Sequence, residues 1–284
     1  MMRGMEIDPQ TYREESLERW GHVAAGWESR REWFRKVTGH VNSWLMEAVD
    51  PQPGQTILEI GAGPGELGLQ VAERLDGGRV ISSDFSPEMV DVARREGEAR
   101  GLTNVEYRVL DAENLDLADG EVDAVVCRWA YMLMADPAAA MRETRRVLRP
   151  GGPLAFAVWR SAERNPWQAV PSMTMVQRGH MPAPVPGAPG IFAMGEPGRI
   201  RELVTGAGFD EPQVEEIAFE YTYSDFDDLW DALLRLSPLG RTIDALPEEE
   251  RDATRAAVMQ NMASYRNGDG SYTAPAATWA VLAR

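Results

Sequence analysis

Cysteine, lysine and histidine are scarce in this chain of 284 residues. Cys127 is the only cysteine, which excludes an internal disulfide and a cysteine-rich zinc site. Lys36 is the only lysine, and the sequence contains no G-x-x-x-x-G-K phosphate-binding loop. The three histidines, His22, His40 and His180, are never four residues apart, so the sequence does not predict a metal site.

Long apolar runs and net positive charge are lacking as well. No stretch approaches the roughly 18 uninterrupted apolar residues of a membrane-spanning helix. Lys and Arg total 29 against 45 Asp and Glu, which gives a formal net charge of −16. So acidic a chain repels phosphate backbones, which argues against a nucleic acid partner. We expect a cytoplasmic, globular protein. Exposed lid surface could support a homodimer, although no heptad pattern demands one.

Strands and helices alternate along residues 56–159. The pattern predicts β-strands at 56–60, 79–84, 105–110, 122–128 and 154–159, and helices at 66–75, 87–100 and 137–148. Such alternation is typical of βαβ units in a parallel sheet that is covered by helices on both faces.

The remaining segments surround this α/β core. We expect a helical cap over residues 1–50, a core over 51–160, a proline-rich loop or lid over 161–198, and a C-terminal part of the core over 199–284. The last part includes helices at 198–207, 225–236 and 248–265, strands at 213–223 and 277–283, and a helical lid insertion at about 224–268.

A glycine-rich loop, Gly61-Ala62-Gly63-Pro64-Gly65, directly follows the first strand. Glycines permit a tight turn and a close approach of a ligand to the backbone. Asp84 ends the second strand, 19 residues after Gly65, where a carboxylate can accept hydrogen bonds from both hydroxyls of a ribose. Asp111, Ala112 and Glu113 follow the third strand. A glycine loop between two acidic strand ends predicts a nucleoside ligand.

The residues beside the loop discriminate between nucleosides. Gly61 and Gly63 fit the dinucleotide pattern G-x-G-x-x-G, but its sixth position is Glu66. A carboxylate at the N-terminus of a helix would oppose a bound pyrophosphate. Glu59, just before the glycines, suits a ligand that carries positive charge. These features favour S-adenosylmethionine, which has an ammonium, a sulfonium and no phosphate.

At this point the sequence resembles the class I S-adenosylmethionine-dependent methyltransferases. The similarity is to the small-molecule branch (methyltransferase type 11) that includes the ubiquinone and menaquinone C-methyltransferases. It rests on ILEIGAGPGELG (57–68), Asp84, DAENL (111–115) and RRVLRPGG (145–152). The resemblance implies a Rossmann-like α/β fold with a seven-stranded, mostly parallel sheet, plus helical N-terminal and lid additions. It also implies S-adenosylmethionine as cofactor and S-adenosylhomocysteine as product.

The resemblance further implies roles for individual residues. Contacts with the methionine part, ribose, adenine and amino acid end of the cofactor are expected from Glu59, Gly61, Ala62, Gly63, Gly65, Asp84, Phe85, Met89, Asp111, Ala112, Glu113, Arg128 and Trp129. Candidates for the acceptor pocket are Trp20, Trp27, Tyr131, Trp167 and Phe192. Many aromatic side chains favour a flat or apolar acceptor, although they could equally cage a quaternary ammonium.

The resemblance implies in-line methyl transfer to a small molecule. Such a reaction depends mainly on positioning, and a general base is needed only if the acceptor must lose a proton. The candidates for that base are His180, His22 and Tyr131. Two alternatives stay open, a catalytically inactive S-adenosylmethionine-binding partner protein and an NAD-dependent oxidoreductase.

Overall fold

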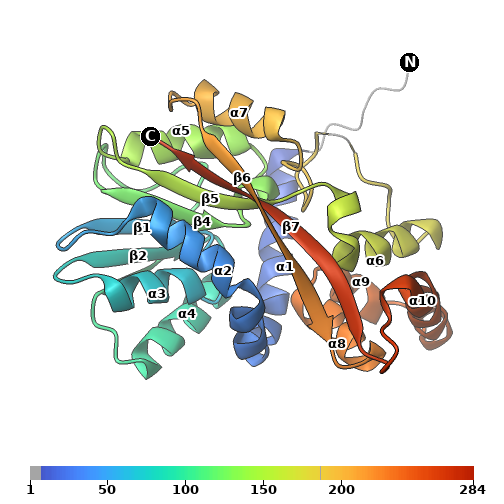
Figure 1. The fold of residues 1–284 in the computed structure, drawn as a ribbon. Coiled ribbons are helices and arrows are strands. Elements are labelled where there is room, and N and C mark those ends of the chain that lie inside the picture. The colour runs from blue at the N-terminus through green and yellow to red at the C-terminus, as the bar shows by residue number, and fades with distance from the viewer. Residues whose placement is uncertain (1–7, 186) are drawn as a thin grey trace, which may run out of the picture.

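The computed structural model describes residues 8–185 and 187–284 and contains a seven-stranded sheet in the order β3-β2-β1-β4-β5-β7-β6 (Figure 1). Strands β1 to β5 are parallel, and β7 runs antiparallel to both β5 and β6. This confirms the expected Rossmann-like architecture. The strands are β1 (Thr56–Ile60), β2 (Arg79–Asp84), β3 (Val105–Val109), β4 (Ala124–Arg128), β5 (Leu154–Trp159), β6 (Gln213–Tyr223) and β7 (Tyr272–Ala283).

Helices cover both faces of the sheet, and β4 and β5 between them are almost entirely buried. One face carries α2 (Arg31–Val49), α3 (Glu66–Arg74) and α4 (Pro87–Ala99), and the other carries α5 (Pro137–Val147) and α7 (Pro197–Gly206). The local sequence explains where these helices begin. Ser86 caps α4 by accepting a hydrogen bond from the backbone N–H of Met89, with Pro87 in the first turn.

Five further helices, here called the cap helices, lie beyond the carboxyl ends of β1 to β4 (Figure 1). They are α1 (Pro9–Ser29), α6 (Pro166–Gln177), α8 (Phe226–Leu236), α9 (Leu239–Asp244) and α10 (Glu248–Asn261). Strands β6 and β7 stay paired from Gln213↔Leu282 to Tyr223↔Tyr272, and this long ribbon carries α8, α9 and α10 away from the sheet. Three single 3-10 turns, at Tyr131–Leu133, Ala162–Arg164 and Ala263–Tyr265, complete the regular structure of the described residues.

The expected cap of residues 1–50 is helical over most of its described part, and residues 1–7 lie outside the described residues. It consists of two helices that meet at Arg30, whose guanidinium lies 2.6 Å from carboxylate oxygens of both Asp228 and Asp231 on α8. Only α1 belongs to the cap helices. Helix α2 packs on the sheet against β4 and β5, because Val41, Leu45 and related residues form an apolar stripe on it.

The structure differs from the sequence-based prediction at two segments that contain prolines. The segment expected as a loop contains α6, with Pro166 in its first turn and Pro171 inside it. Its packing against α10 and β7 compensates for the backbone hydrogen bond that Pro171 cannot donate. Strand β7 begins five residues before the expected Ala277 and includes Pro275. A proline is tolerated there because β5 pairs with β7 only up to Thr278, so Pro275 has a strand neighbour on one side only.

Within residues 8–185 and 187–284, no helix is both long and apolar enough to cross a membrane. The same residues contain no group of three or more His, Cys, Asp or Glu side chains that could hold a metal ion.

Candidate functional site

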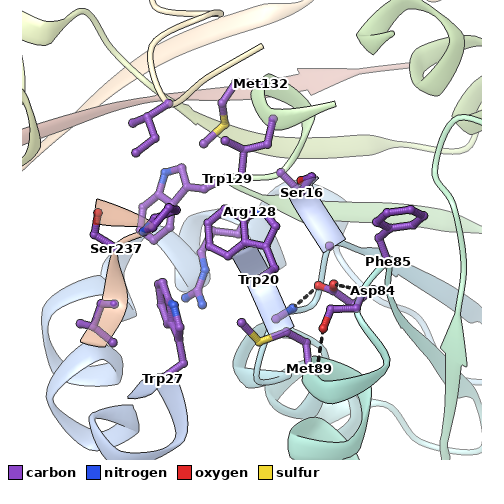
Figure 2. Close-up of a pocket in the computed structure, with 18 of the residues that line it drawn as sticks. Ser16, Trp20, Trp27, Asp84, Phe85, Met89, Arg128, Trp129, Met132 and Ser237 are labelled. Carbon is purple, nitrogen blue, oxygen red and sulfur yellow. Dashed lines mark hydrogen bonds between the residues drawn. The ribbon is translucent and has the colours of Figure 1, made fainter. Parts of the chain in front are cut away.

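A cavity of about 240 Å³ lies between the carboxyl ends of the parallel strands and the cap helices (Figure 2). Two of its sides differ in chemistry. The loop side consists of lining residues from the glycine loop and from the ends of β2 and β3, and it carries carboxylates. The cap side consists of lining residues from α6, β6, α8 and the turn after α8, and none of these described residues carries a charge.

The glycine loop contains one glycine where a side chain would clash and one that borders open space. Gly61 has φ +64°, and a Cβ atom there would lie 2.3 Å from the Cβ of Ala130, just after β4. Gly63 has φ +54°, and no atom lies within 4 Å of the place where its Cβ would be. The backbone at Gly63 therefore borders open space in the cavity, as required for close contact with a ligand.

Asp84 connects this loop to the end of β2. Its Oδ2 accepts a hydrogen bond from the backbone N–H of Gly63 at 2.8 Å, and its Oδ1 accepts one from Ser86 at 2.9 Å. Burial raises the pKa of Asp84, while these backbone hydrogen bonds act in the opposite direction. Each carboxylate oxygen has a second lone pair, so Asp84 can still accept hydrogen bonds from the two hydroxyls of a ribose.

The acidic residues after β3 are linked to helix α1. Arg13 forms an ion pair with Glu113, and its Nε lies 3.8 Å from Asp111. Glu113 also accepts a hydrogen bond from the backbone N–H of Ala135 at 2.8 Å. On the same helix, the hydroxyl of Tyr12 donates to the carbonyl of Leu133 at 2.8 Å. These contacts hold α1 over the loop side of the cavity.

Arg128, at the end of β4, is a positively charged residue that lines the cavity. Its Nη1 donates to Asn42 at 2.5 Å and to Thr38 at 3.2 Å, and its guanidinium lies over the rings of Phe34 and Trp129. No carboxylate of the described residues forms an ion pair with it, and burial lowers its pKa. Arg128 is therefore available to bind the carboxylate of a ligand.

Trp129 is held in an unusual backbone conformation, with φ +59°. Its indole N–H donates to Thr278 at 3.0 Å, and its ring stacks on Trp159 at 4.2 Å between ring centroids. Left-handed backbone is costly for a side chain of this size, and such strain clusters at functional sites. The conformation is stabilised by these contacts and keeps Trp129 in the wall of the cavity.

The structure corrects the electrostatic argument based on Glu59 and Glu66. Glu59 lies beneath the loop and does not line the cavity, because its carboxylate accepts hydrogen bonds from Gly68 and Ser82, both at 2.9 Å. Burial raises the pKa of Glu59 to about 7. Glu66 is buried outside the cavity and is neutralised by Arg100, 2.9 Å away. Neither carboxylate therefore lines the cavity, where it would contact a ligand directly.

The structure places the three candidate bases outside the cavity. His22 is exposed on α1, and the Nε2 of His180 lies 3.4 Å from Glu250 next to α10. Tyr131 is fully buried, with its hydroxyl 2.7 Å from that of Thr144 on α5. Tyr131 therefore does not line the acceptor pocket either.

Most of the other residues predicted from the sequence line the cavity, and two do not. The lining includes Gly61, Ala62, Gly63, Asp84, Phe85, Met89, Asp111, Ala112, Glu113, Arg128, Trp129, Trp20, Trp27 and Trp167, many of which are drawn in Figure 2. Gly65 lies outside it, against Ala93. Phe192 also lies outside, whereas its neighbour Ile191 lines the cavity.

Several lining residues were missed by the sequence analysis, chiefly Gln168, Tyr221 and Ser237. Tyr221 extends an aromatic wall, with ring centroids 4.8 Å from Trp167 and 5.5 Å from Trp33. Burial keeps the pKa of Tyr221 well above its usual value, so its hydroxyl stays protonated at neutral pH. The alternation of polar and apolar residues in β6 could have indicated that Tyr221 faces inward.

The loop side has the donors and acceptors that S-adenosylmethionine requires. Asp84 can hold a ribose, Phe85 and Met89 offer apolar surface to a base, and Arg128 can bind the carboxylate of the amino acid part. The space at Gly63 admits a ligand against the loop backbone.

Comparisons with known proteins agree with this geometry. Residues 57–152 match the family described as "Methyltransferase domain". Over 114 residues the chain is 40% identical to the demethylmenaquinone methyltransferase of Thermus thermophilus, a match that covers 39% of this chain and 51% of that protein. A match with the ubiquinone biosynthesis O-methyltransferase of Acinetobacter baylyi has 28% identity and covers 58% of this chain and 67% of that protein. The chain spans about half the length, or less, of the first curated relatives that it matches.

A solved structure shows the same fold over most of the chain. The crystal structure of a putative methyltransferase from Bacillus halodurans has a TM-score of 0.58 and 21% sequence identity, and the match covers 86% of this chain and 97% of that one. Residues 57–152 therefore match the methyltransferase domain, the chain has the fold of this putative methyltransferase, and its sequence resembles the demethylmenaquinone and ubiquinone methyltransferases.

Proposed function

We propose that this protein transfers the methyl group of S-adenosylmethionine to a small aromatic or apolar molecule. One observation carries the proposal. A single cavity joins a loop side suited to a nucleoside with an uncharged cap side lined by aromatic and aliphatic residues. Two reactants that enter from different sides of one cavity can meet in a fixed orientation, which is the main requirement of a displacement reaction.

The chain's own residues would act by binding and by excluding water. When bound, S-adenosylmethionine supplies an already activated methyl group on a sulfonium. Asp84 would hold the ribose, and Arg128 would hold the carboxylate of the amino acid part. Helix α1, fixed by the Arg13–Glu113 ion pair, would shield the loop side from solvent.

The acceptor would have to be nucleophilic without help from a side chain that removes its proton. Among the described residues, the cap side contains no carboxylate, lysine or histidine, and burial keeps Tyr221 and Tyr223 protonated. This favours acceptors that ionise on their own or need no proton loss, such as acidic phenols, enols or stabilised carbon acids.

Acceptor-dependent formation of S-adenosylhomocysteine tests the proposal. The purified protein is incubated with S-adenosylmethionine and a panel of phenols, reduced quinones and small amines. We expect product above the acceptor-free rate for at least one planar phenol or quinol. Binding of S-adenosylhomocysteine without turnover on any acceptor would instead support the inactive binding protein.

A further inference from the structure

Gln168 and Ser237 are two buried polar side chains among the mainly aromatic and aliphatic residues of the cap side. Gln168 on α6 is 3% exposed, Ser237 after α8 is 6% exposed, and both line the cavity. Their side chains are connected, since the Nε2 of Gln168 lies 3.4 Å from the Oγ of Ser237 and 3.1 Å from that of Ser172. Figure 2 shows Ser237 on the side of the cavity away from Asp84 and Phe85. We call Gln168 and Ser237 the polar pair.

The polar pair has unused hydrogen-bonding capacity. No described residue donates a hydrogen bond to the Oε1 of Gln168, and this oxygen is not fully buried. The Oγ of Ser237 accepts hydrogen bonds from Gln168 and from the backbone N–H of Leu239 at 3.2 Å, but its own proton has no acceptor among the described residues. One acceptor and one donor are thus available beside the cavity. A hydroxyl group, which both donates and accepts, matches this combination.

The charge of the surroundings argues against a cationic ligand. The cap side offers no carboxylate among its described residues, and burial raises the pKa of Tyr221 while the nearby positive charge of Arg128 acts in the opposite direction. The ring of Trp129 is also already in contact with other groups. The Arg128 guanidinium lies over the ring of Trp129, and Trp159 stacks on the same ring, so Trp129 has little free ring surface for a quaternary ammonium.

We propose that the polar pair recognises a hydroxyl group on a planar methyl acceptor that carries no positive charge, with Gln168 accepting from that hydroxyl and Ser237 donating to it. The inference rests on the proposed function and names the substrate class of the same site. Buried polar groups in an apolar pocket discriminate strongly against a ligand that leaves them unpaired. Gln168 and Ser237 are therefore specificity residues, and the protein should distinguish ligands of equal shape by one hydroxyl.

Calorimetric titration with 1-naphthol and naphthalene tests this, because the two differ by one hydroxyl. Wild type, Gln168→Met, Ser237→Ala and Ser172→Ala are titrated with each compound, in the presence and absence of S-adenosylhomocysteine. Ser172→Ala is the matched control, since Ser172 contacts Gln168 but does not line the cavity. Choline is the cationic probe. Thermal unfolding of each variant checks that it is folded.

We expect wild type to bind 1-naphthol about tenfold or more tightly than naphthalene, a preference that Gln168→Met and Ser237→Ala reduce and Ser172→Ala retains. Three results with wild type would each overturn the inference: equal binding of the two compounds, absence of 1-naphthol binding, or tighter binding of choline. None of these results requires a variant to fold. The S-adenosylhomocysteine titration separately tests the proposed function. If S-adenosylhomocysteine does not bind, the proposed function fails. The comparison of 1-naphthol with naphthalene in the absence of S-adenosylhomocysteine then still tests the polar pair.

Discussion

Asp84 is the residue on which the loop side most depends. Its two oxygens fix the glycine loop and the turn after β2 at the same time. In Asp84→Asn, the new amide N–H₂ group faces one of two backbone N–H donors, so a hydrogen bond is replaced by a repulsive contact. We expect S-adenosylhomocysteine affinity to fall about 10- to 100-fold in calorimetry, consistent with loss of roughly 1–3 kcal/mol. Asp91→Asn, on the exposed part of α4, should bind as wild type does, and equal affinity of all three proteins would contradict the assigned role.

Glu59 makes stability depend on pH. Its folded pKa, about 7, lies above the ordinary value of 4.5, so between these values the folded protein holds a proton that the unfolded chain has released. The contribution of Glu59 to stability is therefore present below pH 4.5 and is lost as pH rises through 7. Glu59→Gln retains a neutral hydrogen-bonding group for Gly68 and Ser82.

We expect the melting temperature of Glu59→Gln, relative to wild type, to increase between pH 5 and pH 8. Glu47→Gln, at an exposed position on α2, serves as the control and should show no such trend. A constant difference between Glu59→Gln and wild type across this range would mean that Glu59 does not titrate there.

His180 should be dispensable for the reaction. It lies outside the cavity beside Glu250, although a general base would contribute about 10²- to 10⁴-fold to the rate. With any acceptor that supports turnover, His180→Ala should keep both kcat and the pH profile of kcat/KM. Loss of the ascending limb of that profile would show that His180 reaches the acceptor after all.

At the scale of elements, the contact between α1 and α8 sets the position of the cap helices. A Cβ atom on Gly26 of α1 would lie 2.2 Å from the carbonyl oxygen of Arg235 on α8, so Gly26→Ala forces the helices apart. We expect a loss of about 1–3 kcal/mol in the free energy of unfolding, measured by urea denaturation.

Gly39→Ala on α2 is the matched control, because no atom lies within 4 Å of its added Cβ. Alanine has the higher helix propensity, so this variant should be as stable as wild type or more stable by up to about 1 kcal/mol. Equal effects of the two substitutions would show that α1 and α8 are not closely packed.

The sequence predicted the elements of the core better than those around it. Residues 56–60 and 79–84 form strands as expected, because both are short β-rich runs bounded by turn residues. Helix α9 was missed because its six residues are too few for a periodic pattern. The prolines in α6 and β7 are tolerated only through packing and through the ending of β5, which local sequence does not reveal.

On the scale of the whole molecule, the cavity is the product of distant segments. The loop side could be predicted because its residues follow consecutive strands that end at one edge of the sheet. The cap side could not, because Gln168, Tyr221 and Ser237 come together only when β6 and β7 carry α8 across the cavity. Glu59 was misassigned for a related reason, since sequence does not show that Gly68 and Ser82 bind its carboxylate beneath the loop.

The central claim is that the loop side binds S-adenosylmethionine, and calorimetric titration with its product tests this most directly. Wild-type protein is titrated with S-adenosylhomocysteine and, in parallel, with NAD. We predict one-to-one binding of S-adenosylhomocysteine with a micromolar Kd and no detectable binding of NAD. Absence of S-adenosylhomocysteine binding, or tighter binding of NAD, would contradict the account.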